Sequence, residues 1–176
     1  MGRRGFDPLE IAERLARGEL GPCGDGRFSI DRHGTWSYEG SMIARPELVR
    51  LFARVLHRLP DGRHFLITPF ERIEVEVEDA PFLAVDLREE TGEAGPRLVF
   101  RTNVGEEVVL SPRHPLRPVP DGRGGAVPYL ALERGLEARV TRAVFYELVD
   151  RALPGADGRF GVISEGTWFP LEPEPR

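Results

Sequence analysis

Two stretches of this chain are near copies of each other: DGRFSIDRHGTW at residues 25–36 and DGRFGVISEGTW at residues 157–168. Asp, Gly, Arg, Phe, Gly, Thr and Trp fall at the same internal spacing in both stretches. Self-similarity of this kind reports architecture, so it predicts a duplicated chain that folds as two related halves. The alternative is that the repeat is purely structural, with Trp36 and Trp168 each closing a small core.

The length and composition indicate a folded globular protein. The chain has 176 residues, of which 40% are hydrophobic and 30% charged, enough for one large domain or two small ones. No apolar run is long enough to cross a bilayer and the start lacks the apolar region of a signal peptide, so we expect no membrane association and a cytoplasmic location. Cys23 is the single cysteine, which excludes an intrachain disulfide and a zinc site built from cysteines.

The charge pattern argues against nucleic-acid binding. The net charge is −5, and basic residues alternate with acidic ones without forming a basic stripe. All 24 basic residues are arginine, a bias that points to a GC-rich bacterial genome. Every cationic contact is therefore a planar guanidinium, and no lysine is present to form a Schiff base.

Apolar spacing and turn residues predict an alternation of helices and hairpins. The predicted helices cover residues 7–18, 46–59 and 136–153, each with an apolar stripe at helical spacing. The predicted strands cover residues 28–30, 35–38, 64–68, 72–78, 82–87, 98–102, 107–110 and the closing hairpin 160–169. Gly34 is expected at positive φ in the first hairpin, and residues 112–125 are expected to form a rigid proline and glycine loop.

The same Asp-Gly-Arg turn follows each predicted helix, starting at Asp25, Asp61 and Asp157. The polar segment EETGEAGP, residues 89–96, is the best candidate for the joint between the halves. We therefore predict an α+β fold of two tandem, structurally related lobes, each a small, mostly antiparallel sheet or partial barrel packed on one long helix. The predicted division is an N-terminal helix and turn at 1–22, an N-terminal lobe at 23–92 and a C-terminal lobe at 93–176.

No recognised catalytic motif is present. The four histidines, His33, His57, His64 and His114, form no pair at metal-ligand spacing, so ordinary structural roles are expected for them. Gly122, Gly124 and Gly125 lack the strand-to-helix setting of a phosphate-binding loop. We expect no metal, no cofactor and no enzymatic activity.

An arginine-rich segment is the strongest sign of a binding site. Arg134, Arg139 and Arg142 surround the start of the predicted second long helix, where guanidinium groups favour an anion. Arg45 holds the corresponding position in the first lobe. The alternative is that these arginines are solvated or paired with glutamates. Asn103, the only asparagine, precedes Val-Gly and fits a turn position at positive φ.

Four segments resemble a bacterial domain-of-unknown-function family, DUF1285. They are RPELVRLFA at 45–53, DAPF at 79–82, RTNVG at 101–105 and RGLEAR at 134–139, and the likeness covers nearly the whole chain. The resemblance implies a duplicated α/β core, a C-terminal half superficially similar to pleckstrin-homology folds and a nucleotide-type ligand site between the halves. The family has no agreed catalytic residues.

Three hypotheses of different classes follow. The first is a non-catalytic sensor that binds a nucleotide-like or other anionic small molecule between the lobes and signals to a protein partner. Its predicted ligand-binding residues are Trp36, Arg45, Phe82, Asn103, Arg134, Arg139 and Arg142. The second is a protein-interaction module that docks a partner on a sheet edge or on the proline loop, without a small ligand. The third is an enzyme with a site assembled from distant residues.

Overall fold

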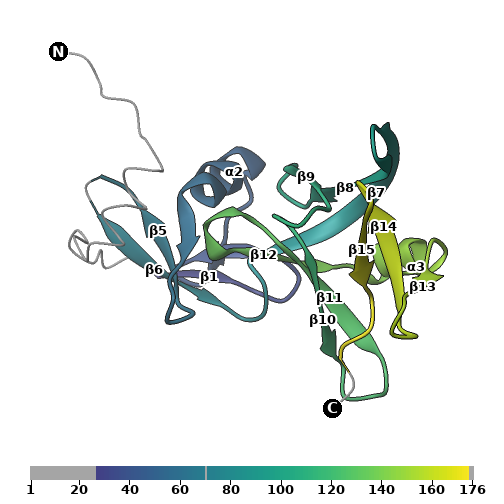
Figure 1. Ribbon diagram of the computed structural model, residues 1–176. Helices are drawn as coiled ribbons and strands as arrows, with labels where there is room; N and C mark the ends of the chain where they lie inside the picture. The colour runs from purple at the N-terminus through teal and green to yellow at the C-terminus, as the bar shows by residue number, and fades with distance from the viewer. Residues whose placement is uncertain (1–26, 70, 175–176) are drawn as a thin grey trace. The chain divides into compact units, whose positions relative to one another are not determined.

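The computed structural model describes residues 27–69 and 71–174, and the chain divides between Asp79 and Ala80 into two compact units (Figure 1). The predicted helix at 7–18 lies outside the described residues. The division falls before the predicted joint at 89–96, because that turn-rich segment is the tip of a long hairpin, in which Gly92 pairs with Gly95.

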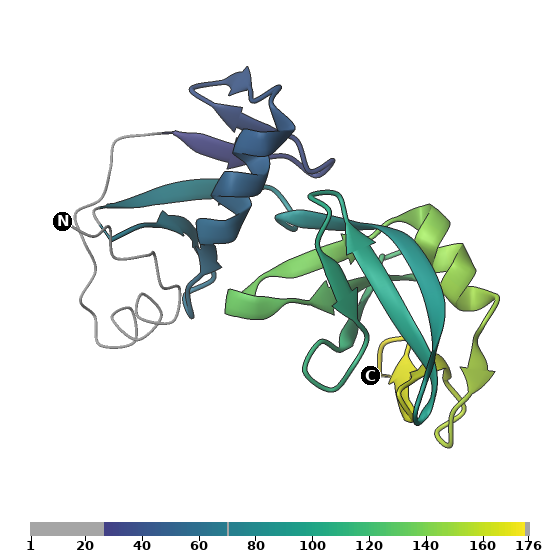
Figure 2. The ribbon, with the colours of Figure 1, turned by 90° about the horizontal axis from the view of Figure 1, so that it is seen from above.

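The N-terminal unit is built on one six-stranded sheet. Its strands run in the order β3-β2-β1-β6-β5-β4. Helix α2 lies across this sheet (Figure 2). The elements are β1 (Phe28–Ile30), β2 (Trp36–Tyr38), β3 (Ser41–Met42), α2 (Pro46–Val55), β4 (Leu56–Arg58), β5 (His64–Ile67) and β6 (Arg72–Val77).

The C-terminal unit has a second six-stranded sheet and a smaller three-stranded one. Their orders are β10-β11-β12-β7-β8-β9 and β13-β14-β15. The elements are β7 (Phe82–Gly92), β8 (Gly95–Thr102), β9 (Glu107–Val109), β10 (Leu116–Pro120), β11 (Ala126–Ala131), the short 3-10 helix η1 (Glu133–Gly135), β12 (Glu137–Val140), α3 (Arg142–Val149), β13 (Leu153–Pro154), β14 (Phe160–Ser164) and β15 (Thr167–Pro170).

The two six-stranded sheets have the same topology. Read from its other edge, the second sheet is β9-β8-β7-β12-β11-β10, which repeats the order β3-β2-β1-β6-β5-β4. Each sheet consists of two antiparallel three-stranded meanders, and the first strand of one meander pairs in parallel with the last strand of the other. The prediction of two tandem, related α+β domains is confirmed, and each sheet is mixed because of its central parallel pair.

The sequence repeat does not occupy equivalent places in this duplicated topology. Both copies form antiparallel hairpins, β1–β2 and β14–β15, but the second lies in the small sheet. The topological counterpart of β1–β2 is the hairpin β7–β8. The two turns also differ, since Ile30 pairs with Trp36 in the first copy while Ile163 pairs with Trp168 in the second.

The expectation of positive φ at Gly34 is confirmed, since its φ is 77°, a value that glycine adopts without steric cost. Gly166, at the equivalent position of the second copy, has a φ of 74°. The residue before Gly166, Glu165, also has positive φ, 49°, as a tight two-residue hairpin turn requires.

The helices are shorter than predicted. Helix α2 begins at Pro46 as expected but ends at Val55, because the next residues join the sheet as β4. The apolar stripe of α2, expected to be core, is only partly covered, since Leu48 and Leu51 are exposed.

The prediction of a helix over 136–153 is wrong in its first part. Residues Glu137–Val140 form β12, and α3 begins only at Arg142. Leu136, Ala138 and Val140 are buried at alternate positions, the period of a strand with one face in the core. Among the described residues, neither lobe is therefore packed on one long helix, and none of the helices is long and apolar enough to cross a membrane.

Candidate functional site

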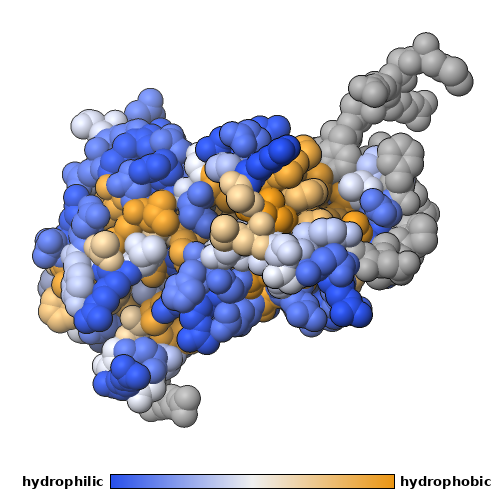
Figure 3. Space-filling view, turned by 180° about the vertical axis from the view of Figure 1, so that it is seen from behind, coloured by the Kyte–Doolittle hydropathy of each residue, from blue (hydrophilic) through white to orange (hydrophobic). Residues whose placement is uncertain are grey.

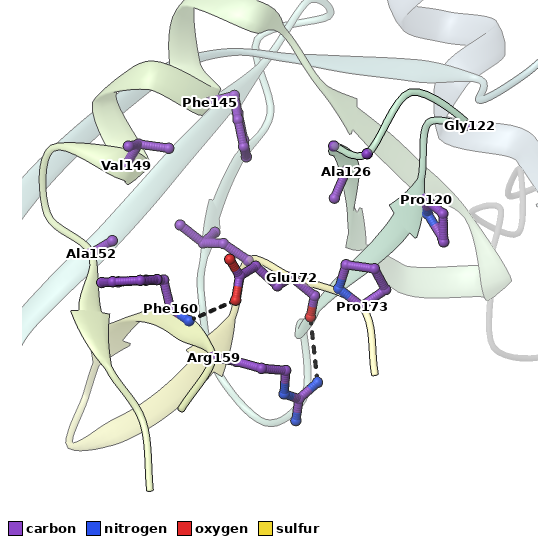
Figure 4. Close-up of a pocket in the computed structure, with 13 residues that line it drawn as sticks. Pro120, Gly122, Ala126, Phe145, Val149, Ala152, Arg159, Phe160, Glu172 and Pro173 are labelled. Carbon is purple, nitrogen blue, oxygen red and sulfur yellow. Dashed lines mark hydrogen bonds between the residues drawn. The ribbon is translucent and has the colours of Figure 1, made fainter. Parts of the chain in front are cut away.

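A pocket of about 740 Å³ lies within the C-terminal unit (Figure 4). Four segments far apart in sequence meet around it: the tip of the β10–β11 hairpin, the last turns of α3, the start of β14 and the residues after β15. We call it the C-terminal pocket. Its lining includes Pro120, Ala126, Phe145, Val149, Phe160 and Leu171, so its walls are mainly apolar.

An aspartate holds the glycine loop on one side of the pocket. The Asp121 Oδ1 atom accepts hydrogen bonds from the backbone N–H groups of Arg123 at 2.8 Å and Gly125 at 2.9 Å. Gly122 and Gly124 take φ values of 75° and 88°. The prediction of a loop over residues 112–125 is therefore wrong at Leu116–Pro120, which form β10 and pair with β11 just beyond the segment.

Among the described residues that line the pocket, Arg159 and Glu172 carry the charged side chains. The Glu172 Oε2 atom accepts a hydrogen bond from the backbone N–H of Phe160 at 3.0 Å. The Arg159 guanidinium donates to Asp157 Oδ2 at 2.6 Å and to the backbone oxygen of Glu172 at 3.3 Å. Figure 4 shows the Glu172 carboxylate among the lining residues, between Phe145 and Phe160. The arginine is thus already paired, while the carboxylate faces the space that a ligand would enter.

The rim of the pocket carries exposed apolar side chains. Phe160 is 50% exposed and Val149 46% exposed. Neighbouring Leu153, which is not part of the lining, is 51% exposed. Apolar patches interrupt the polar surface elsewhere on the molecule too (Figure 3). Side chains of this size in an open pocket gain free energy when an apolar group covers them.

The two aromatic residues predicted to stack on a ligand lie in the cores. Trp36 and Phe82 are each 1% exposed. The Trp36 ring stacks on Phe52 at 6.3 Å between centroids, and Phe82 pairs with Ala138 in the second sheet. In this arrangement neither ring has a free face for a ligand.

Asn103 ties the β8–β9 turn to β7. Its Oδ1 atom accepts a hydrogen bond from the backbone N–H of Leu83 at 3.0 Å, and the backbone N–H of Asn103 donates to the backbone oxygen of Leu83 at 2.9 Å. Gly105, and not Asn103, has positive φ in this turn. The asparagine amide oxygen is therefore already used within the fold.

The predicted arginines lie on separate elements, and none of them lines the C-terminal pocket. Arg134 is half-buried in η1 with φ 59°, and burial lowers the pKa of its guanidinium against the opposing effect of Glu106 and Glu133. Arg139 lies within β12. Only Arg142 begins a helix, α3, where it donates to the Tyr146 hydroxyl at 3.0 Å.

The remaining predicted groups have ordinary surroundings. Arg45 precedes α2 in the N-terminal unit and is exposed. The Nδ1 atoms of His57 and His114 each lie 3.0 Å from a backbone oxygen. Within residues 27–69 and 71–174, no group of three or more His, Cys, Asp or Glu side chains is arranged to hold a metal ion.

The Asp-Gly-Arg turns share one geometry. The turns predicted at Asp61 and Asp157 are joined by a third Asp-Gly-Arg turn at Asp121. In each turn the aspartate Oδ1 atom accepts a hydrogen bond from the backbone N–H of the arginine two residues later, at 2.8 to 3.0 Å. The turn at Asp25 lies outside the described residues. This hydrogen bond is the main reason that the pKa of each of these aspartates lies below its ordinary value.

The lowered pKa values of these three aspartates predict that the fold loses stability as the pH falls into the acid range. A carboxylate whose pKa is lower in the folded chain than in the unfolded one stabilises the fold above the unfolded pKa of about 4, and this contribution is lost as pH falls through the folded value. We expect the triple variant Asp61→Asn, Asp121→Asn, Asp157→Asn to lose stability less steeply between pH 5 and 2 (roughly the range of carboxylate titration). Urea unfolding at several pH values measures this, and an unchanged slope contradicts it.

Comparison with known proteins places the chain in a family. Two family models of DUF1285, a protein family of unknown function, match the chain. The N-terminal domain model matches residues 20–80, and the C-terminal domain model matches residues 81–171. These ranges meet within one residue of the point where the two compact units divide. No curated protein matches the chain.

Two solved structures agree with this assignment. A DUF1285 family protein from Silicibacter pomeroyi DSS-3 is 36% identical with a TM-score of 0.80, over 98% of this chain and 91% of that one. A DUF1285 family protein from Shewanella baltica OS155 is 33% identical with a TM-score of 0.57, over 70% of this chain and 90% of that one. The chain therefore belongs to the DUF1285 family.

Proposed function

We propose that this chain is a non-enzymatic binding protein and that the C-terminal pocket holds a small ligand with an apolar body. The observation that carries the proposal is the pocket itself: about 740 Å³, with mainly apolar walls and few polar groups. Small-molecule sites in proteins have volumes of about 300–1,000 Å³ and this same composition. In this proposal the protein acts in the bacterial cytoplasm as a sensor, and ligand binding in the pocket is communicated to a protein partner.

The polar groups favour a ligand that donates hydrogen bonds. The Glu172 carboxylate faces the pocket, whereas Arg159 is paired with Asp157 and with the backbone of Glu172. A primary amine attached to an apolar body would satisfy the carboxylate, and a carboxylate or phosphate in its place would be repelled. The lining therefore favours an apolar amine over a nucleotide.

A pair of probe molecules with the same apolar body tests this chemistry. We expect phenylbutylamine to bind more tightly than phenylbutyrate at neutral pH, with a Kd on the order of millimolar from about 0.3 kcal/mol per non-hydrogen atom. Saturation-transfer NMR on the full chain detects binding in this range. Phe160→Ala removes one wall and should reduce the amine signal at least about fivefold (roughly the effect of losing 1 kcal/mol).

Two further variants make the test selective. Leu153→Ala removes an equally exposed apolar side chain outside the lining and should leave the signal unchanged. Glu172→Gln keeps an acceptor for the Phe160 N–H and should reduce the preference for the amine over the acid. Equal signals from both probes, or the same loss in Leu153→Ala and Phe160→Ala, would refute the proposed site. Tight binding of adenosine monophosphate would instead favour the nucleotide-type ligand.

A protein-interaction module is the second candidate function. The exposed rim residues Val149, Leu153 and Phe160 favour it, because a partner would bury them together. In that case Leu153→Ala and Phe160→Ala would weaken partner binding alike, while neither probe would bind in the pocket.

A further inference from the structure

Helix α3 of the C-terminal unit has one buried side and one exposed side. Val144 and Leu148 are fully buried, and the helix contacts β7. The helix runs along the outside of its unit (Figure 2). Its outward side carries five exposed residues at helical spacing, which we call the α3 stripe: Arg142, Ala143, Tyr146, Val149 and the C-cap residue Asp150.

The centre of the α3 stripe is apolar and amphipathic. Tyr146 is 52% exposed and Val149 46%. The Arg142 Nε atom donates to the Tyr146 hydroxyl at 3.0 Å, and the guanidinium carbon lies 5.6 Å from the centroid of the Tyr146 ring. This bond uses Nε, while the two NH2 groups of the guanidinium carry its other N–H donors. The arginine therefore lies along the stripe with donors for a carboxylate.

The two charges of the stripe oppose the dipole of their own helix. A helix N-terminus favours a carboxylate and a C-terminus favours a cation. Arg142 is the first residue of α3, whose first turn has no acidic residue, and Asp150 caps its end. Arg151, the next residue, donates to the Glu147 backbone oxygen and pairs with Glu89 of β7 at 3.4 Å, so it serves the helix end from the side of the sheet. A partner with the reverse charge pattern would compensate both ends of the stripe.

The stripe itself has that reverse pattern when it is turned around. Arg142 and Asp150 lie four residues on either side of Tyr146, and Ala143 and Val149 lie three residues on either side. When two α3 helices pack antiparallel about a two-fold axis at Tyr146, each Arg142 faces the Asp150 of the other copy. Each small Ala143 then faces the larger Val149. The N-terminus of each helix also lies beside the C-terminus of the other, where the two dipoles attract.

We propose that the α3 stripe is the contact surface of a symmetric homodimer, in which a second copy of this chain binds antiparallel through its own α3. The helix has eight residues, so it is about 12 Å long at 1.5 Å per residue. Such a contact is smaller than a standard interface of about 800 Å² per partner, and we expect a weak dimer with a Kd on the order of 100 μM. The inference does not rest on the ligand proposed for the C-terminal pocket, although Val149 belongs to both surfaces.

Sedimentation equilibrium on the full chain, at concentrations below and above the expected Kd, tests the proposal. We expect a reversible equilibrium between monomer and dimer. Arg142→Glu sets carboxylates against each other at both ends of the contact, and Asp150→Arg sets guanidinium groups against each other. Each change should weaken dimerisation at least about tenfold, because like charges in a contact repel. Both variants should stay folded, since each new charge suits the dipole of α3, and circular dichroism checks this.

An equimolar mixture of these two variants gives the sharpest result. In the mixed dimer the two carboxylates of one chain face the two guanidinium groups of the other, so the mixture should associate although neither variant does so alone. The variant with both replacements exchanges the charges of each pair and should dimerise as well.

A matched variant separates this contact from general effects of charge. Arg50→Glu makes the same charge change at an exposed position of α2 and should leave dimerisation unchanged. A chain that stays monomeric well above the expected Kd would overturn the proposal. Dimerisation that persists unchanged in Arg142→Glu, or a mixture that associates no better than its separate components, would overturn it too.

Discussion

Replacement of Trp36 by alanine is expected to lower the free energy of unfolding of the N-terminal unit by about 3–5 kcal/mol, the usual cost of removing a buried tryptophan. Trp36 is among the largest fully buried side chains and packs on Phe52. Its indole N–H has no hydrogen-bond partner among the described residues, so the loss comes from packing alone. A change of this size is a large part of the stability of a small unit.

The second tryptophan of the repeat is the natural control. Trp168 is only partly buried, and its N–H makes one long hydrogen bond, 3.5 Å, to the Leu153 oxygen. Trp168→Ala should therefore cost less than Trp36→Ala. Native-state hydrogen exchange of β5 and β8 reports each unit separately. Equal losses for the two variants would contradict the different environments that the structure gives the two copies of the repeat.

Gly161→Ala is expected to destabilise the C-terminal unit by at least about 1–3 kcal/mol, the usual cost of overpacking. A Cβ atom at Gly161 would lie 2.4 Å from the Phe169 backbone oxygen and 2.5 Å from the Trp168 ring. The first contact is with the paired strand β15, so relief requires the β14–β15 hairpin to shift. Ser29 occupies the equivalent position in the first copy, where the tryptophan ring, Trp36, stacks on Phe52. Chemical denaturation followed by circular dichroism measures the loss.

A comparison with Gly155 distinguishes the effect of the Trp168 ring from that of the Phe169 backbone. A Cβ atom at Gly155 would meet the Trp168 ring, with its nearest atom at 2.6 Å. In double-mutant cycles, Trp168→Ala should relieve most of the loss caused by Gly155→Ala but only part of that caused by Gly161→Ala. Full relief in both cycles would show that the Phe169 backbone does not constrain Gly161.

Local sequence signals predicted the elements that depend on neighbouring residues. The hairpin β1–β2 was predictable because apolar residues alternate on both sides of a turn with Gly34. The start of α2 was predictable because Pro46 suits the first turn of a helix. The strands β5, β6 and β8 also lie close to their predicted positions, since each alternates or is apolar throughout.

Long-range pairing decided the elements that sequence patterns missed. Leu136, Ala138 and Val140 fit a helix when joined to the apolar residues that follow, but parallel pairing with β7, more than fifty residues earlier, fixes them as a strand. The polar segment at 89–96 has the composition of a linker. It continues a ladder instead, because its two sides pair with each other out to Gly92 and Gly95.

The pocket was not predictable because no single segment contains it. Its glycine loop matches a phosphate-binding motif only weakly, and Phe145, Phe160 and Glu172 have no spacing that marks a site. The predicted arginines, in contrast, lie close together in sequence. The change from η1 to β12 to α3 places Arg134, Arg139 and Arg142 on three different elements.

Mapping the phenylbutylamine site by amide chemical shifts on the full, isotope-labelled chain tests the central claim most directly. We expect titration to shift the signals of Gly122, Gly124 and Phe160, which line the C-terminal pocket, and to leave those of β5 and β6 in place. Shifts confined to the N-terminal unit, or no shifts at a concentration several times the expected Kd, would contradict the assignment of ligand binding to this pocket.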